Sequence, residues 1–327
     1  MNIRNPGARR RQSAAALILA CLAAGAFAQA DFPSKPVRLI VAFPPGQATD
    51  IVARLMAEDL TRLWGHQVVV DNRGGGNSIP GTMAGRNAPP DGYTLTFATS
   101  SSIAVNPSLY AQLPYDTAKD FAMLHGAFTV PWVIVAHPSA PYSTLKDMVD
   151  LAKKNPDTLT WGYGAASLQL GAELFKIRTS AKIVGVPYKG SAPAMTDLLG
   201  AQIPLLLDTM AATLPHIKAG KMKALAVLTP QRVPQLPELP TVAELGYPGF
   251  DASGWGGLVA PKATPGAVLT KISADVRRVL QDPAMQQRII ERGAVPDLRG
   301  PKEWSQFVNA ELVKWADVAR RANVKAE

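Results

Sequence analysis

Two segments of the chain place small residues between an apolar, strand-like run and a helix-like run, at Pro45-Gly46-Gln47-Ala48-Thr49-Asp50 and Gly162-Tyr163-Gly164-Ala165-Ala166-Ser167. A helix that begins in this way exposes backbone N–H groups at the positive end of its dipole, where a carboxylate or phosphate can bind. For the first segment the alternative is that Thr49 or Asp50 only caps its own helix. Asp50 also adds a negative charge, so the first segment alone favours the capping role.

The second segment is similar to the G-x-G-x-x-G fingerprint of dinucleotide-binding proteins, without its last glycine. That fingerprint needs an acidic residue at the end of the next strand, and the next strand ends at Tyr188-Lys189 instead. We therefore expect no NAD, and a second anion site at this helix start remains plausible. A third segment, Ser100-Ser101-Ser102, follows another strand, and its hydroxyls either bind ligand oxygens or form a polar turn.

No group of residues has the spacing of a catalytic or metal site. The four histidines, His66, His125, His137 and His216, are dispersed. The chain contains neither G-x-S-x-G nor H-E-x-x-H. We expect no catalytic residue, no metal and no cofactor. A hydrolase that used Ser100, Ser101 or Ser167 would lack a nearby histidine base.

The first thirty residues have the pattern of a secretory signal peptide, with four arginines, an apolar run over residues 14–28 and the cleavage site Ala28-Gln29-Ala30. Cleavage after Ala30 would change the net charge from +9 to +5, because the segment carries four arginines and no acids. Twin-arginine export and lipid attachment at Cys21 are the alternatives. Cys21 is the only cysteine, so the mature chain forms no disulfide. We therefore expect a periplasmic protein.

The 327 residues suffice for two domains, and their basic side chains are scattered, which excludes a nucleic-acid interface. Strands and helices alternate over residues 37–99 and again over residues 132–228, which predicts mainly parallel sheets flanked by helices. A proline-rich connection over residues 230–250 leads to a strand and three helices without a sheet of their own. We expect lobe one at residues 31–129, lobe two at 130–252 and a return to lobe one at 253–327.

Two crossings between lobes make a hinge and a cleft, where loops at the carboxyl ends of strands bind ligands. The order of several motifs along the chain resembles one family. These are Asp71-Asn72-Arg73, Pro90-Asp91-Gly92-Tyr93-Thr94-Leu95, Val186-Pro187-Tyr188-Lys189-Gly190-Ser191-Ala192-Pro193-Ala194, and Leu214-Pro215-His216-Ile217-Lys218-Ala219-Gly220-Lys221. The family is that of Bug-type receptors, the extracytoplasmic solute-binding proteins of tripartite tricarboxylate transporters.

The resemblance implies an α/β, two-lobe periplasmic binding protein of type II, a Venus flytrap. It implies that the protein captures a small organic carboxylate, delivers it to membrane permease subunits and acts as a monomer. A sensing subunit that docks on a membrane kinase is the alternative. The implied ligand-binding residues are Phe43, Gly46, Gln47, Ala48, Thr49, Asp50, Ser100, Ser101, Tyr163, Gly164, Ala165, Ala166, Ser167, Gln169, Tyr188 and Asp208.

Three of these positions depart from the family pattern. Gln47 stands where a second glycine is usual, and the lobe-two loop carries Tyr163 and, in place of a histidine, Gln169. If the ring of Tyr163 faces the cleft, aromatic or monocarboxylic acids should bind better than citrate-like ones. The alternative is that Tyr163 points into the core beside Trp161.

Overall fold

The computed structural model describes residues 32–325. Its strands follow the order β2-β1-β3-β9-β4-β7-β5-β6, and a group of three parallel strands lies at each end of this path. The group in lobe one consists of β1 (Val37–Val41), β2 (Val68–Asn72) and β3 (Thr94–Thr99). The group in lobe two consists of β5 (Leu159–Tyr163), β6 (Ile183–Pro187) and β7 (Leu205–Thr209). The predicted parallel strands are confirmed in both lobes.

Two long antiparallel strands join the lobes, β4 (Phe121–Ala136) and β9 (Ser253–Pro261). The first part of β4 pairs with β9, and its last residues pair with β7 and with β8 (Lys223–Val227). The sequence predicted a strand only over residues 132–136, because Gly126 and Pro131 interrupt the apolar pattern before it. The register of β4 against β9 shifts near Gly126, so an irregularity sits where the pattern is broken.

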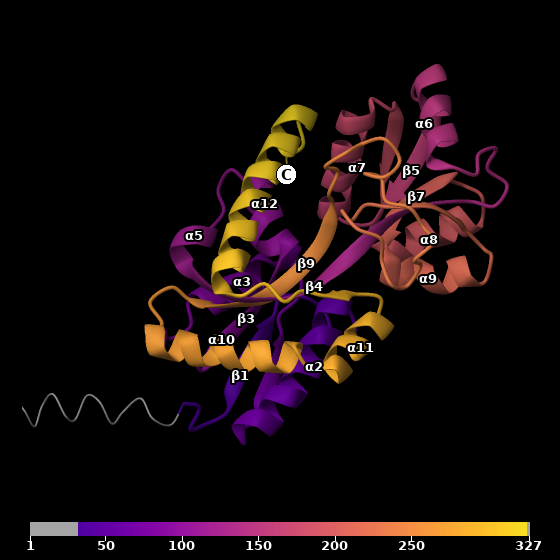
Figure 1. Ribbon diagram of the computed structural model, residues 1–327. Helices are drawn as coiled ribbons and strands as arrows, with labels where there is room; N and C mark the ends of the chain where they lie inside the picture. Colours follow the sequence, from indigo (N-terminus) through magenta and orange to yellow (C-terminus); the bar gives the residue numbers. More distant parts are fainter. Residues whose placement is uncertain (1–31, 326–327) are drawn as a thin grey trace, which may run out of the picture.

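Helices cover both sides of the sheet in each lobe (Figure 1). In lobe one, α2 (Ala48–Trp64), α10 (Gly266–Leu280) and α11 (Pro283–Glu291) lie on one side, and α3 (Ile79–Arg86) and α12 (Pro301–Ala322) on the other. In lobe two, α6 (Leu145–Lys154) and α7 (Ala166–Thr179) lie apart from α8 (Ser191–Leu199) and α9 (Met210–Lys218). Each helix buries apolar side chains against the sheet, which gives the chain its cores.

Short elements complete the connections. A π-helical turn (Ser101–Val105) follows β3 and runs into α4 (Asn106–Leu109), and α5 (Thr117–Asp120) precedes β4. A 3-10 turn (Gly76–Ser78) precedes α3, and β10 (Val295–Pro296) pairs with β4. The sequence predicted neither α3 nor the helical turns after β3, since proline, glycine and serine obscure their periodicity.

The lobe limits at residues 130 and 253 stay a prediction, because both fall at strands that continue from one lobe to the other. The predicted signal peptide and its cleavage site lie outside the described residues. Within residues 32–325, no helix is both long and apolar enough to cross a membrane.

Helix α12 is fixed to strand β9 through one buried carboxylate. Glu311 accepts hydrogen bonds from the indole N–H groups of Trp255 and Trp315, both at 2.8 Å, and pairs with Lys314. Glu311 is only 4% exposed, so its charge depends on these partners. Because Trp315 also packs against Trp132 of β4, at 6.1 Å between ring centroids, Glu311 and Trp315 together tie α12 to both linking strands.

We expect Glu311→Ala to lower the free energy of unfolding by about 2–4 kcal/mol, because it leaves two buried indole N–H groups without an acceptor. Glu311→Gln keeps one acceptor oxygen and should cost less. Asp317→Ala, on the exposed side of the same helix, should leave the melting temperature unchanged. Urea unfolding followed by circular dichroism measures all three. Equal stability of Glu311→Ala and Asp317→Ala would contradict this role for Glu311.

Candidate ligand-binding site

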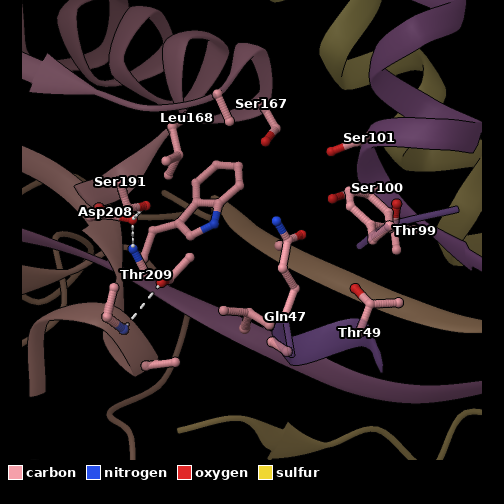
Figure 2. Close-up of a pocket in the computed structure, with 18 of the residues that line it drawn as sticks. Gln47, Thr49, Thr99, Ser100, Ser101, Ser167, Leu168, Ser191, Asp208 and Thr209 are labelled. Carbon is pink, nitrogen blue, oxygen red and sulfur yellow. Dashed lines mark hydrogen bonds between the residues drawn. The ribbon is translucent and has the colours of Figure 1, made fainter. Parts of the chain in front are cut away.

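A cavity of about 590 Å3 lies between the lobes, and residues of both lobes and of the two linking strands form its wall (Figure 2). Most of the residues predicted from the sequence line it, namely Phe43, Gly46, Gln47, Ala48, Thr49, Ser100, Ser101, Gly164, Ala165, Ser167 and Asp208. The volume is in the range of small-molecule sites. The structure therefore brings the two helix starts and the serine segment to one place.

The start of α2 forms the lobe-one part of the wall. Gln47 occupies the N-cap position with extended backbone, and its side chain accepts no hydrogen bond from the first turn. Gly46 has a φ of 87°, and a Cβ atom there would meet nothing within 4 Å. Glycine suits this backbone, and the first N–H groups of α2 have no side-chain cap.

The negative charge of Asp50 is directed away from the cavity. Its carboxylate accepts hydrogen bonds from the Gly46 N–H at 2.8 Å, from Arg54 at 3.0 Å and from Asn72 at 2.8 Å. Burial by itself would raise the pKa of Asp50, but these hydrogen bonds and the charge of Arg54 hold it below its ordinary value. Asp50 does not line the cavity, so it fixes the Gly46 turn without opposing an anion there.

Two helix starts lie together in lobe two. Ala165 and Gly190 are the N-cap positions of α7 and α8, and neither helix has a side-chain cap. Gly164 packs directly on the next loop, because a Cβ atom on it would lie 2.4 Å from the carbonyl carbon of Gly190. This backbone contact holds the first turns of α7 and α8 side by side at the cavity wall. Helix α9 differs, since Thr209 caps it through the Ala212 N–H.

The three serines after β3 divide between the two roles expected from the sequence. The Ser102 hydroxyl accepts a hydrogen bond from the Thr99 N–H at 2.9 Å and closes the turn. Ser100 and Ser101 line the cavity, and Figure 2 shows Ser101 facing Ser167 of lobe two. The lobes thus present hydroxyl groups to each other across the cavity.

Asp208 is a fully buried carboxyl group in the lobe-two wall. Its Oδ1 atom accepts hydrogen bonds from the Ser191 hydroxyl at 2.8 Å and from the Thr209 N–H at 2.7 Å. Burial raises the pKa of Asp208, and the hydrogen bonds from Thr209 and Ser191 oppose part of that rise. The Oδ2 atom has no partner within the described residues.

Five of the residues predicted from the sequence do not line this cavity: Asp50, Tyr163, Ala166, Gln169 and Tyr188. The sequence left open whether Tyr163 faces the cleft or the core, and the core alternative is the one observed, since Tyr163 is 6% exposed and its ring lies against Gly185. Burial also raises the pKa of its hydroxyl. The Tyr188 hydroxyl donates to Asp197 at 2.7 Å, and Ala166 lines a neighbouring, smaller cavity.

The linking strands contribute lining residues that the sequence analysis missed. These are Phe128, Val130 and Trp132 of β4 and Gly254 and Trp255 of β9, together with Arg292 after α11. The sequence-based prediction rested on loops at the carboxyl ends of parallel strands, and these residues lie elsewhere. The apolar and aromatic residues over 128–132 could have indicated a lining strand. A strand shared by two lobes must pass beneath the cleft between them, so its side chains can line that cleft.

The model of the tripartite tricarboxylate transporter family receptor matches residues 52–324. The chain belongs to this family. Protein BugT of Bordetella pertussis is 37% identical over 297 residues, which cover 90% of this chain and 91% of BugT. A solved R. palustris protein with adipate is 34% identical, with a TM-score of 0.79, and covers 90% of this chain and 99% of its own. MatC from Rhodopseudomonas palustris with bound malate is 28% identical, with a TM-score of 0.74, and covers 88% and 99%.

These relatives confirm the predicted periplasmic-binding-protein fold and the Bug-type family. The chain is a solute-binding receptor of this family, whose members are periplasmic binding proteins and not enzymes. Within the described residues, no cluster of histidine, cysteine or acidic side chains has the geometry to hold a metal ion. The wall chemistry agrees with binding, because backbone N–H groups, hydroxyls and aromatic rings are the groups that orient ligands in small-molecule sites.

We expect Ala48→Asp and Ala165→Asp each to weaken binding of an organic anion by about a hundredfold or more. The new carboxylate would occupy the N–H groups at the helix start and repel a second anion. Calorimetry with a carboxylate found by the screen described below measures the loss. Ala165→Asn caps the same N–H groups without charge and should lose less. Ala263→Asp, which does not line the cavity, should bind as wild type, and unchanged affinity in both test variants would place the site elsewhere.

Proposed function

We propose that this receptor captures a small organic carboxylate in the cavity between its lobes and delivers it to the membrane permease subunits of a tripartite transporter. The observation that carries the proposal is the pair of helix starts without side-chain caps, at α2 in one lobe and at α7 in the other. Their N–H groups need an acceptor, and a carboxylate offers two oxygens.

The relatives support the same chemistry for this chain, because two of them were solved with carboxylates, adipate and malate. The ligand would contact α2 and Ser100 of lobe one and α7 of lobe two together only when the lobes are close. Binding then favours the closed state, and the closed state is the form that a permease would recognise. The proposed mature receptor begins at Asp31 and acts as a monomer.

We expect a thermal-shift screen to find at least one stabilising acid among dicarboxylates, tricarboxylates, aromatic acids and amino acids. A ligand at a hundred times its Kd adds about 2.7 kcal/mol to the free energy of unfolding. Each acid is paired with its neutral amide, which keeps the size and removes the charge, and the amide should give little or no shift. A protein that no acid stabilises, or that acids and amides stabilise equally, would refute the proposed carboxylate receptor.

A further inference from the structure

The carboxylate of Asp208 lies in the cavity wall with half of its hydrogen-bonding capacity unused. Its side chain is 0% exposed, and both donors, Ser191 and Thr209, bond to Oδ1. Within residues 32–325, nothing donates to the buried Oδ2 atom. A buried carboxylate oxygen without a donor is unfavourable, so a group that fills this end of the cavity gains by donating to it.

The charges around the cavity disfavour a second ionised carboxylate as that group. Asp208 and Arg292 are the only charged side chains among the described residues that line the cavity, and Arg292 is exposed. A ligand carboxylate beside Oδ2 would therefore meet a carboxyl group with no cation to separate them.

The remaining polar groups give the cavity two different ends. Figure 2 shows Asp208 with Ser191 and Thr209 at one end, and Ser100 and Thr49 at the other. The far end has the first turn of α2 and the serine hydroxyls, which donate hydrogen bonds. One end thus suits an anion, and the other suits a hydrogen-bond donor.

We propose that the ligand is a carboxylic acid that also carries a hydrogen-bond donor, an O–H or N–H group, and that Asp208 accepts this donor through Oδ2. This inference rests on the proposed function and adds the class of ligand. Asp208 is then a residue that determines specificity, and it selects substituted acids over plain ones of the same length.

Three sets of acids test the proposal on the wild-type protein: propionate, lactate and alanine; succinate, malate and aspartate; and adipate, 2-hydroxyadipate and 2-aminoadipate. Members of a set differ only in a hydrogen, hydroxyl or ammonium group. In the set that binds best, we expect the hydroxy or amino acid to bind about tenfold to a hundredfold more tightly than the plain acid. If plain and substituted acids bind equally, this inference fails and the proposed function stands. If no acid of any length binds, the proposed function fails as well.

Asp208→Asn assigns the preference to this residue. The asparagine can keep a carbonyl oxygen toward Ser191 and Thr209 but presents an amide N–H2 in place of Oδ2. We expect the preference for the substituted acid to disappear while the plain acid binds as well as before or better. A purely structural role would instead weaken every member of the set by the same factor, and that result would overturn the proposal.

Asp197→Asn is the matched control. Asp197 is another lobe-two carboxylate with a hydrogen bond, from Tyr188, and it does not line the cavity. We expect Asp197→Asn to keep the full preference for the substituted acid over the plain acid. If Asp197→Asn loses this preference, a specific role for Asp208 is contradicted. Circular dichroism and melting curves establish that both variants fold. The wild-type comparison needs no variant, so it decides the proposal even where Asp208→Asn does not fold.

Discussion

The backbone N–H groups at the starts of α2, α7 and α8 are the constraint on which the site depends. None of these helices has a side-chain cap, so the donors need a partner from outside the helix. This need explains the small residue at the N-cap position Ala165, because serine, threonine or aspartate there would satisfy the donors internally. It also explains why Asp50 turns toward Arg54 and Asn72, since a free carboxylate at the start of α2 would compete with an anionic ligand.

The linking strands determine where these helix starts meet. β4 and β9 run from one lobe to the other, and Trp132 and Trp255 on them line the cavity. Helix α12 contacts both indoles: Trp132 packs against the ring of Trp315, and Trp255 donates a hydrogen bond to the carboxylate of Glu311. Trp255 is therefore fixed to lobe one, whereas Trp132 contacts both α12 and, at Gly171, helix α7 of lobe two.

The sequence predicted what depends on local patterns and missed what depends on neighbouring strands. The starts of α2 and α7 follow from small residues after apolar runs, and the structure places both at the cavity. The burial of Tyr163 could have been read from alternation, because Trp161 on the same face of β5 is a core residue. The space for the Tyr163 ring comes from Gly185 on β6, which pairs with Trp161. No local pattern specifies that pairing, nor the passage of β4 beneath the cavity.

Hydrogen-bond donors at element ends have two roles in this receptor: one group is free for a ligand, and the other binds a carboxyl group of the protein. In lobe one, the start of α2 has no internal anion, because Asp50 is turned away and the cap position is Gln47. In lobe two, the corresponding donors bind a carboxyl group of the protein itself, that of Asp208. They are the N–H of Thr209, between β7 and α9, and the hydroxyl of Ser191, the first residue of α8. N–H and O–H donors favour an anion whether it belongs to a ligand or to the chain, although at Asp208 burial outweighs them and raises the pKa. Since one end of the cavity already contains a carboxyl group of the protein, the two ends are complementary to different groups, and the cavity wall imposes a direction on whatever acid it binds.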